Sequence, residues 1–539
     1  MKALFRLVSL WRGQAFWLAL GLIFSLLATA TAVALSGAAG AVFAGGTLLA
    51  APLLLRVLGP TRVVSRYLER MLTHNALFRA LADLRVWFFR RIAARMAGGL
   101  GMARAGDLLA RLVGDVEAQD AVYMRVALPL AGALMLLPAL AVVLGKIDAW
   151  VGVTVCLLFA LAAFAMPAIA LRGSLAGGAA LAQAMGGLRV AVLDAMTGLR
   201  EVRSFGAEGR MLAAAQAREA TLLKAQSQAA RRLALAGAAS FICAQAAILA
   251  TLLLGRDHGA VAIALVFIVM AAFEAIAQLP RAGAQAGIAA AAAERIVAIT
   301  DAPIHAPDPA QPAALPGSFA LRVEGVSFRW QEDRPPVFDG LSLDIPQGAH
   351  VALLGPSGIG KSTLAGLCLR LESPQQGRIL LGGVDIATLA AADLRRRIGW
   401  LSQATHLFDD TISANLLLAR PEATDAELWE ALERAQIAEA VRALPAGLET
   451  YLGEGGLGFS GGQGRRVALA RILLSSARIL ILDEPCEGLD AETERQFLAT
   501  LNAAMDGRTT ILIAHHLTGV EKLDRIYRLS AGRAVAAAG

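Results

Sequence analysis

The sequence predicts a fold in two parts, an α-helical membrane domain with six spans followed by an α/β domain. Of its 539 residues, 57% are hydrophobic, more than in an ordinary water-soluble enzyme. Six apolar runs have about the 20 residues that cross a bilayer, and short strand-like and helix-like segments alternate after them. We assign residues 1–300 to the membrane domain, 301–317 to a linker and 318–539 to the α/β domain.

The charges divide in the same way as the apolar runs. Residues 1–301 hold 28 Lys and Arg against 15 Asp and Glu, whereas residues 302–539 hold 22 against 28. The arginines of the first part lie between apolar runs and not on one compact polar face. We therefore interpret them as cytoplasmic loop charges rather than as a nucleic-acid-binding surface. The four cysteines have no C-x-x-C spacing, so neither a disulfide framework nor a zinc site is predicted.

The first apolar run follows basic residues, as in a signal peptide, but it is long enough to span and further runs follow, so we expect a retained helix. The expected spans are Phe16–Ser36, Ala38–Gly59, Val126–Leu144, Trp150–Leu171, Leu233–Leu254 and Val261–Leu279. The two long connections carry most of the arginines, so both termini are expected in the cytoplasm.

Both long connections also have the pattern of helices that continue from their spans. In the first connection, apolar residues recur at mostly three- and four-residue spacing: Leu68, Leu72, Leu77, Leu81, Leu84 and Phe88. At 1.5 Å per residue, such helices would extend tens of ångströms from the membrane. After them, "DAPIHAPDPAQPAALPG" (301–317) has five prolines and no apolar period, which is typical of a linker. "FALRVEGVSFRW" and "GAHVALLG" then predict strands.

A phosphate-binding loop is predicted at "GPSGIGKST" (355–363), between the apolar strand "HVALL" and the helical "TLAGLCLRL". Glycines in such a loop let backbone N–H groups converge on phosphate oxygens at a helix N-terminus. A lysine adds positive charge at the β- and γ-phosphates, and a hydroxyl can bind Mg²⁺. The expected phosphate-binding residues are Gly355, Ser357, Gly358, Gly360, Lys361, Ser362 and Thr363.

A second motif, "ARILILDEP", ends an apolar strand in Asp483 and Glu484. An aspartate there can help hold Mg²⁺ and the neighbouring glutamate can act on the attacking water, so the two motifs predict a nucleotide triphosphatase. The alternative is an acidic strand end that faces solvent. Gly456, Gly458 and Gly461 also spell the dinucleotide fingerprint G-x-G-x-x-G, but no buried strand precedes them, so we set that interpretation aside.

The motifs of the second part, taken in order, resemble the full series of an ATP-binding cassette (ABC) ATPase. They are Trp330, the phosphate loop, Gln403, "FSGGQ" at 459–463, "LILDEP", Asp490 in "EGLD", and His515 in "ILIAHH". The resemblance implies ATP and Mg²⁺ as cofactors, with Ser362, Gln403 and Asp483 at the metal. It implies that Trp330 stacks on adenine, Glu484 is the catalytic base and His515 contacts the γ-phosphate.

The same resemblance implies that the cassette works as a pair. Ser460, Gly461, Gly462 and Gln463 would complete the ATP site of an opposite subunit, so a chain with one cassette needs a partner. His516 does not match the motif, and we interpret it as a surface bystander.

The six expected spans with their arginine-rich connections, followed by this series of cassette motifs, resemble an ABC exporter half-transporter. The stretches at 65–91, 106–126 and 273–280, with "DEPCEGLD", are similar to the CydC subunit family of the CydDC thiol exporter. That resemblance implies a heterodimer with a CydD-like subunit in the bacterial inner membrane. It also implies export of cysteine or glutathione to the periplasm, in support of cytochrome bd assembly.

For the substrate, the sequence offers three ionisable residues in or near spans: Glu274, Arg56 and Arg66. Arginine suits the carboxylates of glutathione, but Glu274 could instead pair with Arg281 or face water, and the arginines could be anchors. Two other functions stay open, a homodimeric drug or lipid exporter and an ATP-regulated cytochrome or haem assembly factor. No histidine falls within an expected span, which gives haem binding little support.

Overall fold

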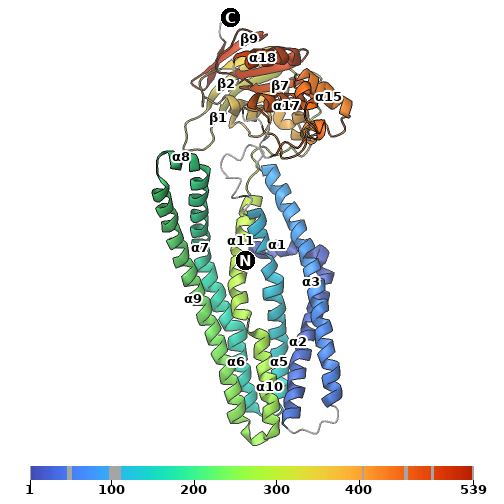
Figure 1. Cartoon of the computed structure of the whole chain (residues 1–539), viewed down its shortest axis with the longest axis vertical. Helices are drawn as coiled ribbons and strands as arrows, with labels where there is room; N and C mark the ends of the chain where they lie inside the picture. The colour runs from blue at the N-terminus through green and yellow to red at the C-terminus, as the bar shows by residue number, and fades with distance from the viewer. Residues whose placement is uncertain are drawn as a thin grey trace. The chain divides into compact units, whose positions relative to one another are not determined.

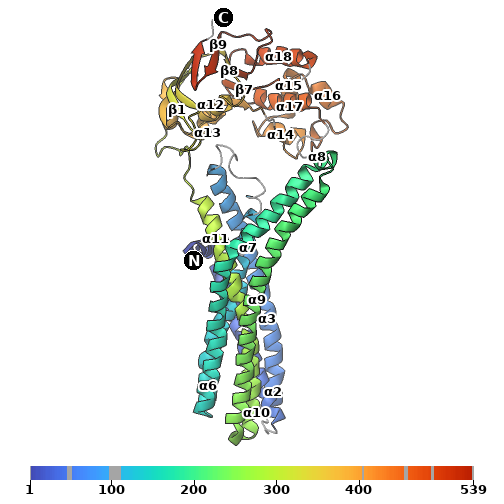
Figure 2. The same ribbon diagram turned by 90° about the vertical axis from the view of Figure 1, so that its left-hand side faces the viewer.

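The computed structural model describes residues 2–44, 51–95, 108, 111–403, 406–453, 459–486 and 491–536. The chain forms two compact units, which divide in sequence between Ala302 and Pro303. The described part of the first unit consists of helices, and the second unit combines two β-sheets with helices (Figures 1 and 2).

The described residues of the first unit form a bundle of helices, several of them long. Its α-helices are α1 (Lys2–Ser9), α2 (Ala15–Phe43), α3 (Ala51–Arg95), α5 (Leu128–Gly145), α6 (Ala149–Ala160), α7 (Met166–Thr197), α8 (Leu199–Ser204), α9 (Glu208–Leu254), α10 (Ala260–Ile276) and α11 (Leu279–Thr300). Its other helical turns are η1 (Leu10–Gln14), η2 (Arg111–Asp115), η3 (Val122–Ala127), η4 (Leu161–Ala165) and η5 (Arg256–His258).

Within the described ranges, five helical segments are long and apolar enough to cross a membrane: Lys2–Phe43, Val122–Gly145, Ala149–Thr197, Glu208–Leu254 and Val261–Thr300. Apolar side chains cover their outer surface, including Phe16, Leu157 and Phe241, each more than 60% exposed. Such a surface is stable against lipid and not against water. These segments coincide with five of the six expected spans, while Ala38–Gly59 lies partly outside the described residues.

The expected boundary between the first two spans, at Gly37, is wrong. Helix α2 continues through Gly37 to Phe43. A Cβ on Gly37 would lie 2.8 Å from Ile268, and one on Gly40 would lie 2.9 Å from the Ala264 backbone. These glycines let α2 and α10 pack closely, as small residues do between membrane helices, and they do not form a turn.

In the described residues, both long arginine-rich connections contain helices that continue from their spans, as predicted: α3 runs to Arg95 in the first, and α7 and α9 form the second. Helices α7 and α9 lie side by side over their length, and the short α8 joins them at one end (Figure 1). In α3, Leu77, Leu81, Leu84 and Phe88 are all at most 3% exposed and pack with residues of α1 and α11. The three- and four-residue spacing therefore marks a buried face.

The last expected span, Val261–Leu279, also differs from the structure. Helix α10 ends at Ile276, and α11 starts at Leu279 with Pro280 in its first turn. Proline has no N–H for the preceding helix, so the helical hydrogen bonding is interrupted here. Helix α11 is rich in alanine and glycine and packs closely on α7, where a Cβ on Gly287 would lie 2.7 Å from Ser174.

The second unit contains a six-stranded sheet in the order β10-β9-β3-β8-β7-β6, parallel except for β10, and an antiparallel sheet in the order β2-β1-β4-β5. The strands are β1 (Leu321–Phe328), β2 (Phe338–Ile345), β3 (His350–Leu354), β4 (Gln376–Leu381), β5 (Val384–Asp385), β6 (Ile398–Leu401), β7 (Ile479–Asp483), β8 (Thr509–Ala514), β9 (Arg525–Ser530) and β10 (Arg533–Ala536). The two predicted strands correspond to β1 and β3.

The helices of this unit belong to two hydrophobic cores. They are α12 (Lys361–Cys368), η6 (Ile386–Thr388), α13 (Ala391–Arg397), α14 (Ile412–Leu417), α15 (Asp425–Arg434), α16 (Ala438–Arg442), η7 (Gly447–Glu449), α17 (Gly461–Leu474) and α18 (Ala491–Met505). One core joins the two sheets with α12, and the other lies among α14 to α18. Figure 2 shows α14, α15, α16 and α17 gathered on one side of the unit.

The proline-rich segment after Ala302 packs on the second unit. Arg370, only 4% exposed, donates hydrogen bonds to the carbonyls of Pro307 and Leu389 and pairs with Asp308 at 3.2 Å. The Ala313 N–H donates to Thr388 O at 2.8 Å. The buried guanidinium thus fixes a segment that has no regular structure of its own.

Candidate functional site

The predicted phosphate-binding loop connects the buried strand β3 to α12. Gly358 and Gly360 have φ angles of 79° and 107°, a region that favours glycine. A Cβ on Gly360 would also overlap Val337 Cγ1. The loop can therefore hold its backbone close to a ligand only because these positions carry no side chain.

Four predicted residues from separate parts of the chain meet at the end of this loop. The Lys361 Nζ lies 3.4 Å from the Glu484 Oε1, and the His515 Nε2 lies 2.8 Å from the same oxygen. The Gln403 Nε2 donates to Glu484 Oε2 at 2.8 Å. Lys361 and Glu484 are 5% and 8% exposed. The Glu484 carboxylate is therefore the centre of a largely buried polar cluster.

The parallel strands bring this cluster together. Strand β8 lies between β3 and β7, so the carboxyl ends of all three strands meet at one edge of the sheet. Glu484 follows β7 and His515 follows β8, while Lys361 follows the loop after β3. The interpretation of Asp483 and Glu484 as a solvent-facing strand end is wrong, because Asp483 is only 2% exposed.

Local geometry also holds Glu484 in place. Its φ angle is 48°, which is unusual for a residue with a side chain, and its N–H donates to Ile513 O at 2.9 Å. Such strained backbone conformations are most frequent at functional sites, where contacts with the surrounding structure stabilise them. The Lys361 ammonium is in turn oriented by Gly355 O at 2.8 Å and Pro356 O at 3.3 Å.

The loop fits the phosphates of a nucleotide. Its glycines leave the backbone accessible, Lys361 supplies a fixed positive charge, and the first turn of α12 has free N–H groups. Ser362 and Thr363 are in that first turn, and Ser357 is exposed in the loop. The residue types assigned to Mg²⁺, a hydroxyl, an amide oxygen and a carboxylate, are the oxygen donors that this ion prefers.

Ser460 to Gln463 form the N-terminus of α17, and they do not join the Lys361 cluster. The Ser460 Oγ accepts from the Gln463 N–H at 3.2 Å, and the Gln463 side chain accepts from the Ser460 N–H at 2.9 Å. This reciprocal capping fixes an exposed helix N-terminus. The remaining first-turn N–H groups of α17 have the geometry that can bind an anion at a helix N-terminus.

Trp330 and His516 are both exposed, and Asp490 lies outside the described residues. Trp330 is 51% exposed and packs edge-on against Phe328, with ring centroids 5.1 Å apart, so one aromatic face is accessible. His516 lines a cavity of about 300 Å³ beside Glu484 together with Cys486. Burial raises the pKa of the Cys486 thiol to about 12, so this cysteine is not a nucleophile at neutral pH.

One functional contact was missed by sequence reasoning. Arg465, on α17, donates hydrogen bonds to the carbonyls of Glu484 and Pro485 at 3.3 and 3.0 Å. It connects the exposed N-terminal turn of α17 with the backbone that carries the catalytic candidate. No local sequence signal distinguishes Arg465 from the neighbouring Arg466, which instead bonds Gln436 O.

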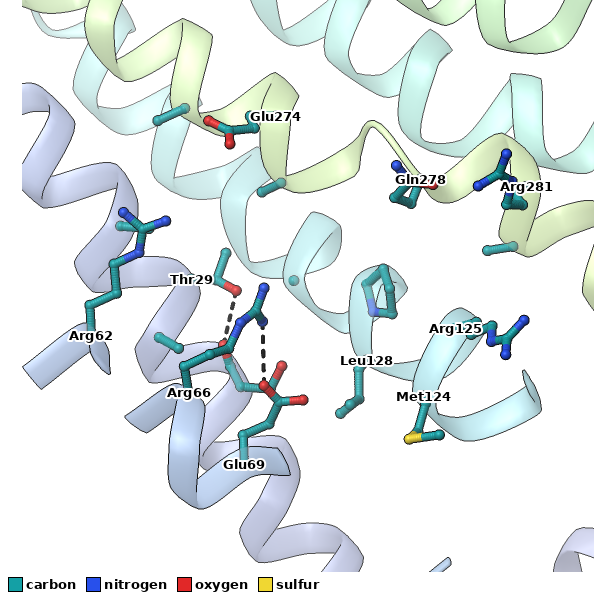
Figure 3. Close-up of a pocket in the computed structure, with 18 of the residues that line it drawn as sticks. Thr29, Arg62, Arg66, Glu69, Met124, Arg125, Leu128, Glu274, Gln278 and Arg281 are labelled. Carbon is teal, nitrogen blue, oxygen red and sulfur yellow. Dashed lines mark hydrogen bonds and ion pairs between the residues drawn. The ribbon is translucent and has the colours of Figure 1, made fainter. Parts of the chain in front are cut away.

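The first unit contains a cavity of about 550 Å³ lined by residues of α2, α3, η3, α5, α10 and α11. Two of the three substrate candidates, Arg66 and Glu274, line it (Figure 3), whereas Arg56 does not. Among the described residues no ion pair joins Glu274 to Arg281, although both side chains line this cavity (Figure 3).

Comparison with known proteins supports one assignment for both units. Residues 338–487 match the ABC transporter family. The chain is 34% identical to the glutathione/L-cysteine transport system ATP-binding/permease protein CydC of Escherichia coli strain K12, over 99% of this chain and 96% of that protein. The CydC of Haemophilus influenzae is 31% identical over the same shares.

Two further similarities differ in the share of the chain that they cover. The ATP-dependent lipid A-core flippase of Chromobacterium violaceum is 43% identical, but over only 45% of this chain and 41% of its own. A solved bacterial Atm1-family ABC exporter with ATP bound has the same fold over 98% of this chain and 94% of its own, with a TM-score of 0.82 and 26% identity. The expectations of an ABC exporter fold and of ATPase-coupled transport are thus confirmed, and the chain belongs to the CydC family of multi-pass, ATP-binding ABC exporters.

Proposed function

We propose that this chain is one half of a heterodimeric transporter that uses ATP to export small thiols, cysteine or glutathione, from the cytoplasm to the periplasm. One observation carries the proposal: the similarity to the two glutathione/L-cysteine transport proteins covers 99% of the chain, including the membrane unit. The similarity to the lipid A-core flippase covers only 45% of the chain, so it carries less weight for the substrate than a similarity over nearly the whole chain.

The proposed partner is a second, CydD-like half-transporter in the bacterial inner membrane, with both termini and the ATPase domain in the cytoplasm. The arginine-rich helical connections support this orientation. The exposed, capped N-terminus of α17 supports the pairing, because Ser460 to Gln463 lie outside the chain's own Lys361 cluster. A role in cytochrome bd assembly is part of the same proposal.

In the proposed mechanism, the phosphates of ATP bind the loop at 355–363 and Trp330 stacks on the adenine. Lys361 then shifts its ammonium from the Glu484 carboxylate to the phosphates, which frees Glu484 to accept a proton from the attacking water. His515 contacts the γ-phosphate from the neighbouring strand end. Ser362, Gln403 and Asp483 would hold Mg²⁺, which neutralises phosphate charge when bound.

The test of the ATPase assignment is Glu484→Gln in the purified transporter. The amide keeps the size of the side chain but cannot take a proton, so we expect ATP binding to remain and turnover to fall roughly 100-fold or more. Glu430→Gln, at an exposed position of α15, is the control and should hydrolyse ATP normally. Hydrolysis at the wild-type rate by the Glu484 variant would exclude it as the base, and a low residual rate is expected from the partner's own site.

The transport assignment is tested by ATP-dependent uptake of cysteine and glutathione into inverted membrane vesicles. Mass spectrometry of the complex purified in mild detergent identifies the partner. A second, different half-transporter together with thiol uptake supports the proposal. Copies of this chain alone, without thiol uptake, would favour a homodimeric drug or lipid exporter, and a haem absorbance band without transport would favour an assembly factor.

A further inference from the structure

The cavity of the first unit has an unusual charge for its position among membrane-spanning helices. Its described lining includes four arginines and two glutamates, hence a formal charge of +2: Arg62, Arg66, Arg125, Arg281, Glu69 and Glu274. Figure 3 shows Arg62, Arg66 and Glu69, from α3, on one wall and Glu274 and Arg281, from α10 and α11, on the facing wall. Ionisable groups at such positions are rare and face a cavity or a partner.

Only one ion pair neutralises this lining. The Arg66 Nη1 lies 3.3 Å from the Glu69 Oε2, and Glu69 is 8% exposed. The other four charged side chains form no ion pair or side-chain hydrogen bond with any described residue: Arg62, Arg125, Arg281 and Glu274. The cavity therefore presents three separate positive groups and one negative group to whatever enters it.

Two features of the helices make room for a ligand between these charges. Along α2, the lining residues Ser25, Thr29, Ala32 and Ser36 recur at three- and four-residue spacing and are all small. The facing wall contains the interruption between α10 and α11, where Gln278 lies between the two helices (Figure 3). The N-terminal turn of α11 thus contributes partial positive charge beside Arg281.

We propose that this cavity selects thiol peptides that carry two carboxylates and one ammonium group over thiols that carry only one carboxylate. Arg62 on one wall and Arg125 and Arg281 on the other bind the two carboxylates, and Glu274 binds the ammonium. The inference rests on the proposed function and specifies its substrate. Glutathione has this set of charges and free cysteine does not.

The balance of charges explains the preference. A ligand with two carboxylates and one ammonium has a net charge of −1, which complements the cavity's excess of arginines, whereas cysteine has a net charge of zero. Arginine binds a carboxylate with two parallel hydrogen bonds, so an unused arginine represents a lost charge-assisted interaction. A volume of about 550 Å³ is also within the range of small-molecule pockets.

A phospholipid could offer the same chemistry, because arginine binds phosphate as well as carboxylate. A pocket for acyl chains would need an extended apolar lining. The apolar lining residues here are mostly alanines, with Met124, Leu128 and Pro129 as the larger ones. Small apolar groups interleaved with charges, and Glu274 placed to accept an ammonium, favour a compact zwitterion with an additional negative charge.

The test compares two thiol dipeptides that differ in their number of carboxylates, in inverted vesicles from the native membrane. γ-Glutamylcysteine has two carboxylates and one ammonium, and cysteinylglycine has one of each. We expect ATP-dependent uptake of γ-glutamylcysteine to be roughly tenfold faster at low concentration, since one charge-assisted contact is worth about a factor of ten. Arg62→Gln and Arg281→Gln should each reduce this ratio towards one, whereas Arg62→Lys should preserve part of it.

Arg256→Gln is the matched control, because Arg256 lies in η5 and does not line the cavity. It should keep the wild-type ratio. Glu274→Gln should raise the KM for both dipeptides, since both have an ammonium group.

Three outcomes overturn the inference, and they are distinguishable from failure of the proposed function. ATP-dependent thiol uptake with an unchanged dipeptide ratio in the Arg62 and Arg281 variants would reject charge selection but keep thiol export. A ratio of one in the wild type would do the same. The cavity would be assigned to lipid if the Arg62 and Arg281 substitutions changed the stimulation of ATP hydrolysis by anionic phospholipid vesicles but left dipeptide uptake unchanged. Failure of the proposed function is different, because no thiol would then be taken up at all.

Discussion

At the scale of single residues, the ATP site depends on positions where a side chain is either forbidden or fixed by burial. Glutamate and lysine would usually be solvated, yet Glu484 and Lys361 are almost completely buried together. Removing one partner of a buried pair leaves an uncompensated charge, which is far more destabilising than losing a surface pair. The cluster therefore tolerates substitution poorly even before ATP binds.

Gly360 provides a prediction at this scale. Gly360→Ala places a Cβ against Val337 at a φ of 107°, so we expect the loop to shift, ATP affinity to fall at least tenfold and stability to decrease by about 1–3 kcal/mol. Binding of a fluorescent ATP analogue and thermal unfolding of the full chain measure both effects. Gly366→Ala, in the helix α12 with no atom near its Cβ, should retain ATP binding, and equal behaviour of the two variants would contradict the steric argument.

Arg370 provides a second prediction. Arg370→Met should destabilise the second unit by about 2–3 kcal/mol, because the carbonyls of Pro307 and Leu389 lose their buried donor. Arg378→Met is the matched control. Arg378 pairs with Glu324 at 2.8 Å on an exposed surface, where solvent screens the pair and its loss should have little effect on stability. Thermal unfolding of the two full-length variants should therefore differ clearly, and similar midpoints would show that the linker contact is weak.

At the scale of elements, close helix packing and not hydrophobicity determines where the membrane helices α2 and α10 end. Apolar runs predicted the spans because lipid requires an apolar surface of a fixed length. They could not predict that α2 extends past Gly37 or that α10 ends at Ile276, since glycine serves both turns and close contacts. Whether a glycine forms a turn or a close contact depends on the helix that packs against it, and that helix can lie far away in the sequence.

The contact of α11 with α7 provides the prediction at this scale. A Cβ on Gly283 would overlap the Pro167 carbonyl, whereas one on Gly178 would meet no atom within 4 Å. We expect Gly283→Ala to destabilise the first unit by about 1–3 kcal/mol and Gly178→Ala to be neutral or to stabilise it by up to about 1 kcal/mol. Thermal stability in detergent compares the two, and a stable Gly283 variant would mean that the helices can separate without loss.

At the scale of the whole molecule, the phosphate loop and the exposed N-terminus of α17, which we propose as a second phosphate-contacting position, do not meet within the chain. The phosphate loop is surrounded by Gln403, Glu484 and His515, while the N-terminus of α17 is exposed. In the proposed heterodimer, each position belongs to a different ATP site. The exposed N-terminus of α17 would then connect this chain to the ATP site of its partner subunit.

Ser460 tests this coupling. Ser460→Asp keeps a good N-cap for α17 but places a negative charge where the partner's γ-phosphate is proposed to bind. We expect ATP hydrolysis by the pair to fall at least tenfold, whereas nucleotide binding to this chain's own loop should be unchanged. Ser460→Thr preserves the hydroxyl and should retain most activity. Normal hydrolysis by the Asp variant would argue against an ATP site shared between subunits.

The sequence by itself determined the two-part fold, most of the membrane spans, the helical connections and the choice of four residues that meet beside the phosphate loop, Lys361, Gln403, Glu484 and His515. These features follow from local patterns: the thickness of the bilayer sets the span length, helix geometry sets the apolar period, and phosphate chemistry requires the loop motif. Only the tertiary structure decided that Gly37 and Gly40 pack against α10, that Arg465 holds the backbone of Glu484, and that Arg62, Arg125, Arg281 and Glu274 share one cavity. Such contacts join residues far apart in the chain, and their partners are chosen by packing and charge in three dimensions.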